Sequence, residues 1–315
     1  MIVPCPENLK EYQRFPLTVT LALLNVFIFV LIFNGASPSL DNNKVLQYEG
    51  MQLTGRLYYQ YLQSLSPQEL QERPEWVHRL RSADADQMGV LGGYALRDAS
   101  FLEVASAQTY KGDAVQIDAW KENIETFRKE YRSQLLFRFG LSSLEKGPLS
   151  WVTYQFSHST WMHLLSNLMF LVVIGVAVEA LAGSGVLLIV YLVGGLAGGL
   201  GFLLSQGHGT VPMVGASASI SALLAFYCVA QTKARIRYVY FISPIEGQYG
   251  FIFLPTLMIL PLFLVVDLAN LWATPEGLGS GVAYAAHLGG SVFGLLGGLA
   301  YRYGARSRSR TLTET

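Results

Sequence analysis

The chain has 315 residues and a formal net charge of zero; 51% of its residues are hydrophobic and 14% are charged. A soluble domain carries roughly 25% charged residues. Only seven of the 44 charged residues (22 basic plus 22 acidic) lie in residues 151–301, whereas 28 lie in residues 35–150. This distribution excludes a soluble enzyme, a coiled coil and a disordered chain, and the zero net charge gives no indication of a nucleic-acid partner. The sequence predicts an integral membrane protein in a lipid bilayer.

The first expected span covers residues 15–34, an apolar run that begins after a short polar stretch. A spanning helix needs about 20 mostly apolar residues, which this run supplies. The run has no small-residue cleavage site, so we expect a retained span and not a signal peptide. Residues 1–14 then form a short cytoplasmic N-terminus.

Residues 35–150 are expected to form one large extracytoplasmic loop between the first two spans, with a length of about 115 residues. A connection of this length is too long to be unstructured in a compact domain. Residues 116–137 carry apolar side chains at helical spacing, and residues 51–72 show a similar pattern with a break at Pro67. We expect two or more surface helices here, lying on the bilayer interface.

Five further apolar runs follow, separated by clusters of Gly, Pro and charge: 160–182, 185–205, 213–231, 251–272 and 281–303. The expected fold is an all-α polytopic membrane protein with a six-helix bundle spanning residues 15–303, the loop insertion 35–150 included. Glycines four residues apart, as at Gly290, Gly294 and Gly298, indicate close helix contacts.

The basic residues outside the large loop determine the expected orientation. A model with a cytoplasmic N-terminus and six spans puts all nine of them on the cytoplasmic side: Lys10, Arg14, Lys233, Arg235, Arg237, Arg302, Arg306, Arg308 and Arg310. Both termini, including a basic tail at 304–315, are then cytoplasmic, and residues 35–150 are extracytoplasmic.

Polar groups inside a membrane are rare and indicate function. In this orientation the second, fourth and sixth spans enter from outside. Ser217 is expected about four residues into the fourth span and His287 about six into the sixth, with His163 and Asn167 at a similar depth. His163 and Asn167 are four residues apart and therefore share a helix face. Four polar side chains from three helices are expected at one level.

These residue types are the parts of a serine hydrolase. A serine hydroxyl becomes a nucleophile when a neutral imidazole accepts its proton, and acyl transfer needs donors for the developing oxyanion. Ser217 lies near Gly215, which allows close approach, and His287 is the candidate base. Ser219 points to another side of the helix, Ser221 lies one turn deeper, and His208 between two glycines is expected in a solvated loop.

The arrangement resembles the rhomboid family of intramembrane serine proteases. The family's His, four residues, His, three residues, Asn pattern corresponds to His158, His163 and Asn167. Its Gly-x-Ser motif corresponds to Gly215 and Ser217, and its Ala-His motif before a Gly-rich helix corresponds to Ala286–His287. Ala218 stands where the family usually has Gly, and the family's Trp-Arg pair is absent near Leu149 and Ser150.

The resemblance implies a Ser217–His287 dyad with no third acid, and an oxyanion site formed by the Ser217 N–H, His163 and Asn167. It implies a supporting role for Gly215 and, at the mouth of the site, for His158. Substrates would be single-pass membrane proteins, cut near the outer bilayer face after entry beside the fifth helix and the 274–281 loop. No cofactor or metal is implied, a bacterial plasma membrane is favoured, and no oligomeric state is indicated.

Two other function classes remain to be compared with a protease. A non-proteolytic rhomboid-like scaffold would bind membrane clients, but such relatives lose the nucleophile or the base, and both are present here. A transporter would show inverted repeats and interrupted helices, which the sequence lacks. Among proteases, a zinc site is excluded because His158 and His163 are five residues apart, and an aspartyl mechanism because Asp267 is the only intramembrane Asp.

Overall fold

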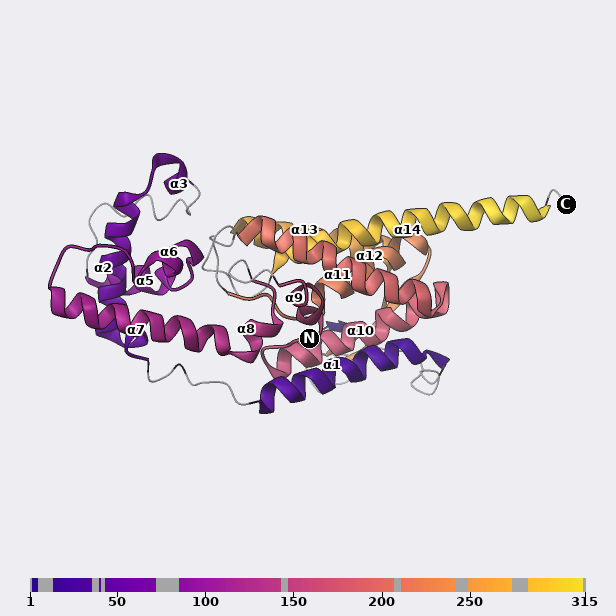
Figure 1. Cartoon of the computed structure of the whole chain (residues 1–315). Helices are drawn as coiled ribbons and strands as arrows, with labels where there is room; N and C mark the ends of the chain where they lie inside the picture. The colour runs from indigo at the N-terminus through magenta and orange to yellow at the C-terminus, as the bar shows by residue number, and fades with distance from the viewer. Residues whose placement is uncertain are drawn as a thin grey trace.

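The computed structural model describes residues 2–4, 14–35, 40, 43–71, 85–142, 147–206, 211–241, 249–273 and 283–313. A bundle of long apolar helices forms one part of the molecule, and a smaller helical unit lies beyond one end of it (Figure 1). The bundle comprises α1 (Pro16–Asn34), α10 (Trp161–Ala182), α11 (Ser184–Gln206), α12 (Ser217–Ala230), α13 (Thr256–Ala273) and α14 (Tyr284–Thr313). The predicted all-α class is confirmed.

Four helices in the described part of the chain are long and apolar enough to cross a membrane: α1, α10, α11 and α13. Together with the composition, they make the chain an integral membrane protein. Helix α12 has only 14 residues, and most of its side chains are buried, as expected of the central helix of a bundle. The count of six spans stays a prediction.

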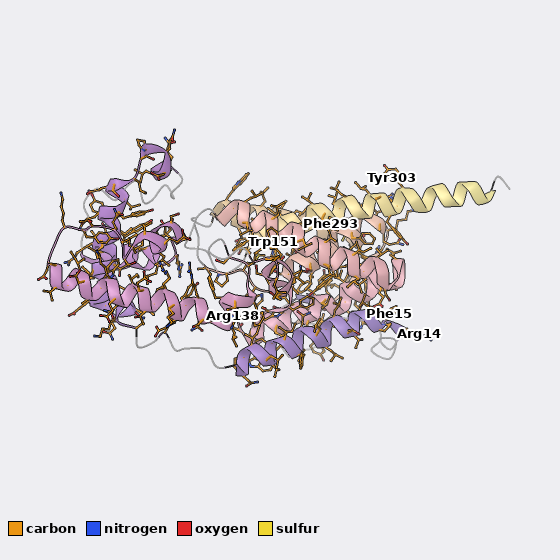
Figure 2. The ribbon with its side chains drawn as sticks, in the orientation of Figure 1. Arg14, Phe15, Arg138, Trp151, Phe293 and Tyr303 are labelled. Atoms are coloured by element: carbon orange, nitrogen blue, oxygen red, sulfur yellow. The ribbon has the colours of Figure 1, made fainter. Side chains whose placement is uncertain are left out.

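The two ends of the bundle differ in what they carry. Arg14, before α1, and Tyr303 on α14 lie at one end, whereas Trp151 and Arg138 lie toward the other (Figure 2). Helix α1 ends, and α10, α12 and α14 begin, at the end that faces the smaller helical unit (Figure 1). The first turns of these three helices therefore share one level, as the site hypothesis requires.

A buried carboxylate joins α10 to the beginning of α1. Glu179, 6% exposed, accepts hydrogen bonds from the backbone N–H groups of Leu17 (3.1 Å) and Thr18 (2.9 Å) and from the Thr18 hydroxyl (2.7 Å). The Ser184 hydroxyl donates a fourth bond of 2.6 Å. The negative charge thus lies at the N-terminus of α1, where the helix dipole and the unpaired N–H groups stabilise it.

We expect Glu179→Ala to lower the free energy of unfolding by about 3 kcal/mol, because it leaves buried donors on α1 without their charged acceptor. Titration of the purified protein with denaturing detergent, followed by circular dichroism, measures the change. Ser205→Ala is the control, since the one partner of the Ser205 hydroxyl among the described residues is the carbonyl of Phe202 on its own helix. Equal midpoints for Glu179→Ala and the wild type would contradict a structural role for this carboxylate.

A small antiparallel sheet accompanies the helices, in the order β1 (Ile2–Pro4), β2 (Arg235–Phe241), β3 (Tyr249–Pro255). Val3 pairs with Val239, and Val239 pairs with Phe251. Ile236 and Tyr238 are buried in the core shared with α10, α12 and α13. The prediction of a helix from residue 251 is wrong at its beginning, because residues 251–255 belong to β3 and α13 starts at Thr256.

The smaller helical unit lies within the predicted loop and has its own core. Its elements are η2 (Lys44–Leu46), α2 (Tyr48–Ser64), α3 (Pro67–Gln71), α5 (Ala85–Ala95), α6 (Ala99–Val104), α7 (Ala114–Ser133) and α8 (Leu135–Phe139). Tyr58, Phe101 and Trp120 are central to that core. The predicted helices exist, but their apolar faces cover a shared core and are not free to lie on a bilayer. Helix α9 (Ser150–Thr153) and η3 (Tyr154–Phe156) lead into the bundle.

Candidate active site

Ser217 is the first residue of α12. The apolar run predicted a helix from residue 213, but Gly215 has a φ of +121° and the helix begins after it. Only glycine adopts this backbone region readily. Because Ser217 opens the helix, its N–H has no acceptor within the helix and points out of it. The side chain of Ser217 is half-buried.

His163 and Asn167 converge on Gly215. A Cβ atom built on Gly215 would lie 2.7 Å from His163 Nε2 and 3.8 Å from Asn167 Nδ2. The Asn167 amide also donates to the carbonyl of His163 on the preceding turn (2.8 Å). The structure therefore brings both predicted oxyanion donors, on α10, next to the segment that carries Ser217.

Hydrogen bonds at the start of α10 orient the ring of His163. The Thr160 hydroxyl caps the helix by accepting from the His163 N–H (3.1 Å), and Ser159 Oγ lies 3.3 Å from His163 Nδ1. When Ser159 donates to Nδ1, the ring proton is on Nε2. That nitrogen faces Gly215 and can then donate a hydrogen bond.

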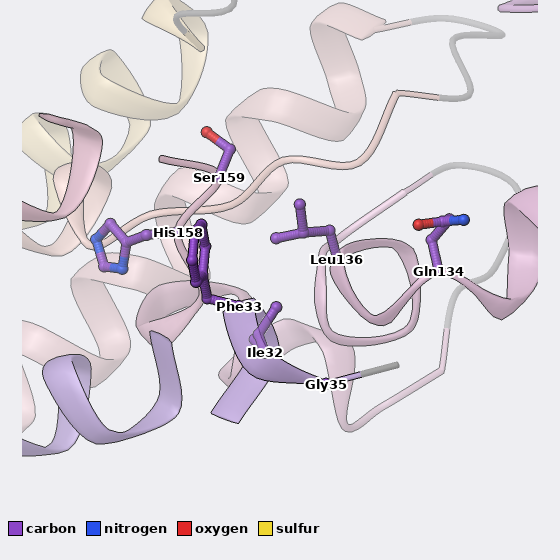
Figure 3. A pocket seen from close by; sticks show the side chains of 7 residues that line it. All are labelled: Ile32, Phe33, Gly35, Gln134, Leu136, His158 and Ser159. Atoms are coloured by element: carbon purple, nitrogen blue, oxygen red, sulfur yellow. The ribbon is translucent and has the colours of Figure 1, made fainter. Parts of the chain in front are cut away.

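His158 precedes α10 and is 1% exposed. Its ring meets that of His163 edge-on, with 5.1 Å between the centroids. Burial, and secondarily the neighbouring His163, lowers the pKa of His158 to about 3, so this ring is uncharged at physiological pH. A cavity of about 190 Å³ adjoins it (Figure 3), lined by Ile32, Phe33, Gly35, Gln134, Leu136, His158 and Ser159. His158 therefore belongs to the surroundings of the site, in contact with the ring of His163.

His287 is the fourth residue of α14 and not the sixth, because the helix begins at Tyr284. Helices α12 and α14 meet closely beside it: a Cβ atom on Gly290 would lie 2.2 Å from the carbonyl oxygen of Ala218. Ser217 and His287 directly neighbour Ala218 and Ala286 in the chain, and these two alanines lie in one buried cluster. Among the described residues, the side chains of Ser217 and His287 form no hydrogen bond with each other. Such catalytic hydrogen bonds often tighten only when substrate binds.

His287 Nδ1 lies 3.2 Å from Oδ1 of Asp267 on α13. Sequence analysis considered Asp267 as a possible aspartyl-protease residue and did not identify His287 as its partner. The resemblance implied no third acid near the base, and on this point the structure differs. No sequence signal links residues 20 apart on two helices separated by a loop.

The rival serines have other partners. Ser219 Oγ donates to Gln155 Oε1 (3.0 Å), and Ser221 Oγ donates to the carbonyl of Ser217 (2.8 Å). Neither is therefore placed as an alternative nucleophile. His208 lies outside the described residues.

Two supports of the site were not found by sequence analysis. The carbonyl of Tyr154 accepts a hydrogen bond from the Gly215 N–H (2.9 Å), and the Tyr154 hydroxyl donates to the carbonyl of Gly195 on α11 (2.5 Å). Leu141 and Met213 exchange two backbone hydrogen bonds of 2.9 and 2.7 Å. The second contact joins the end of the loop insertion to the segment just before Ser217.

Comparison with known families gives one match. The family described as "Rhomboid domain" matches residues 146–304, about half of the chain. This matched range includes every predicted site residue. A search of curated proteins finds no match.

Proposed function

Because the chain belongs to the rhomboid family, a family of intramembrane proteases that also includes non-proteolytic members, we propose that it is an intramembrane serine endopeptidase. Ser217 is the proposed nucleophile and His287 the general base. The substrates are transmembrane segments of single-pass membrane proteins, cut near the outer bilayer face. No cofactor, metal or nucleic acid takes part.

The convergence at Gly215 is the observation that carries this proposal. An acyl-transfer site needs hydrogen-bond donors beside the nucleophile, aimed at the position where negative charge develops. His163 Nε2 and Asn167 Nδ2 approach Gly215, two residues before Ser217, and the Ser217 N–H is a third donor at the start of α12. A site that only bound membrane helices would have no need of three donors grouped around one serine.

The proposed reaction follows from these roles. Ser217 Oγ attacks the carbonyl carbon of the scissile peptide, and its proton passes to Nε2 of His287. The Ser217 N–H, His163 and Asn167 donate to the oxyanion of the tetrahedral intermediate. The carbon–nitrogen bond then breaks, and His287 gives its proton to the leaving amine. Water attacks the acyl-enzyme with the same proton transfers, which releases the new carboxylate and restores the serine hydroxyl.

The proposed topology has six spans over residues 15–303 in a bacterial plasma membrane. Residues 1–14 and 304–315 are cytoplasmic, and the insertion 35–150 is extracytoplasmic. This orientation puts the first turns of α10, α12 and α14 near the outer face, where the substrate would be cut. Substrate is proposed to enter beside α13 and the 274–281 loop, and residues 274–281 lie outside the described residues.

A non-proteolytic scaffold is the second candidate, since the family also includes members without protease activity. Labelling with a fluorophosphonate distinguishes the two, because this probe reacts with a serine only when a base activates it. We expect the full-length protein in detergent to be labelled at Ser217, as mapped by mass spectrometry, and the labelling to disappear in His287→Ala. An unlabelled wild type that is folded and retains an accessible site would favour the scaffold.

A further inference from the structure

Asp267 is a buried carboxylate on α13, a helix whose other residues are almost all apolar. It is 4% exposed on α13, and its Oδ1 atom contacts Nδ1 of His287. Its second oxygen, Oδ2, is buried and has no hydrogen-bond partner among the described residues. In the part of the chain that the structure describes, His287 is thus the one side chain that Asp267 engages.

A carboxylate in this position lowers the stability of the bundle unless it is compensated. Removing a carboxylate from water costs several kcal/mol, and inside a membrane the cost is of similar or larger size. Residues 251–301 contain no Lys or Arg that could pair with Asp267. Among the described residues, His287 is the titratable group in contact with Asp267, and the positive charge that compensates the carboxylate forms when this ring accepts the Ser217 proton.

The remaining neighbours of His287 hold its ring plane. Phe263 on α13 stacks on it at an interplanar angle of 27°, and Tyr284 meets it edge-on at 85°. His163 on α10 is near enough to interact with it electrostatically. With the ring between these groups and Nδ1 directed at Asp267, Nε2 is the nitrogen left for a proton from Ser217.

We propose that Asp267 is a positioning residue that completes an Asp267–His287–Ser217 triad, an inference that rests on the proposed function. The carboxylate accepts the Nδ1–H of His287 and so fixes the tautomer whose Nε2 lone pair faces the nucleophile. Its charge stabilises the imidazolium that forms when Ser217 gives up its proton. Asp267 takes up no proton itself and does not contact the substrate.

Comparing Asp267→Asn with Asp267→Ala in the full-length protein separates the effect of the Asp267 charge from the effect of its hydrogen bond to His287. Asparagine keeps the shape and a hydrogen bond to His287 but lacks the charge. We expect both variants to lower the rate of fluorophosphonate labelling at Ser217 by on the order of 10²-fold or more. We expect Asp267→Asn to keep the unfolding midpoint of the wild type. Asn270→Ala is the control on the same helix, since within the described part of the chain Asn270 Nδ2 bonds to the carbonyl of Val266 on its own helix and to no other group.

The tautomer of His287 can be measured directly, and this second experiment does not depend on a reactive serine. In protein labelled with ¹⁵N-histidine, with the His287 signals assigned by their loss in His287→Ala, we expect the proton on Nδ1 in the wild type. We expect that preference to disappear in Asp267→Ala. Wild-type labelling in Asp267→Asn, or an unchanged tautomer in Asp267→Ala, would overturn the proposal.

The two proposals fail in different ways. Labelling of the wild type that is lost in His287→Ala but unchanged in both Asp267 variants refutes the triad and leaves the protease intact. Absent labelling of the wild type with the expected tautomer refutes the protease and supports the contact between Asp267 and His287.

Discussion

Ser217→Ala is expected to abolish cleavage of a transmembrane substrate while leaving the fold intact. Without the hydroxyl no acyl-enzyme can form, and we expect kcat/KM to fall on the order of 10⁴-fold or more, about 5 kcal/mol of transition-state stabilisation. His287→Ala should lower the rate by a similar factor. The double variant should lose little more than either one, because nucleophile and base act as a unit. Turnover is measured in reconstituted vesicles with a panel of single-pass substrates.

Ser219→Ala is the matched control for this experiment. Ser219 lies two residues further along α12, is fully buried and bonds to Gln155, so its loss removes a hydroxyl from the same helix without touching the site. We expect activity close to that of the wild type. Cleavage that survives in Ser217→Ala and disappears in Ser219→Ala would mean that the nucleophile is assigned to the wrong serine.

Most of the candidate site could be predicted because its residues follow from local spacing. His163 and Asn167 are one helical turn apart, so one face of α10 carries both, and the structure brings that face to Gly215. The boundary of α12 was less predictable. An apolar run does not show where a helix begins, and the start at Ser217 depends on the positive φ of Gly215 and on its hydrogen bond to Tyr154.

The contact between Asp267 and His287 could not be predicted from spacing. It depends on how α13 packs beside α14, and no short-range pattern encodes the rotation of one helix against another. The position of β3 is a different case, since residues 249–254 alternate between exposed and inward side chains. That period of two indicates a strand, but an apolar composition suitable for a membrane helix obscured it.

The loop insertion shows the same limit on a larger scale. Its apolar periodicity predicted helices, and α2 and α7 are present. The pattern did not reveal what covers the apolar faces. That depends on contacts such as the hydrogen bond from Trp120 on α7 to Thr54 on α2, which join residues 66 positions apart.

The glycines of α14 link the packing of the bundle to the chemistry of the site. A Cβ atom on Gly290 would lie 2.2 Å from the carbonyl oxygen of Ala218, and one on Gly294 would lie 2.0 Å from that of Ala222. The backbones of α12 and α14 are therefore in direct contact, as the glycine spacing predicted. Gly290 makes this contact about one turn beyond His287, so it determines how closely the base approaches the helix that carries Ser217.

We expect Gly290→Ala to lower kcat/KM by on the order of 10²-fold, because the added methyl group must push α14 away from α12, and a displacement of about 1 Å has this effect on a reacting pair. The free energy of unfolding should fall by about 1–3 kcal/mol. Gly297→Ala is the control: its Cβ would meet only the ring of Phe226 on α12, at 3.5 Å or more. Turnover and detergent-induced unfolding are measured on both variants. Equal loss of activity in both would mean that α14 as a whole is intolerant of methyl groups, and unchanged turnover in Gly290→Ala would mean that the distance between α12 and α14 does not control the Ser217–His287 pair.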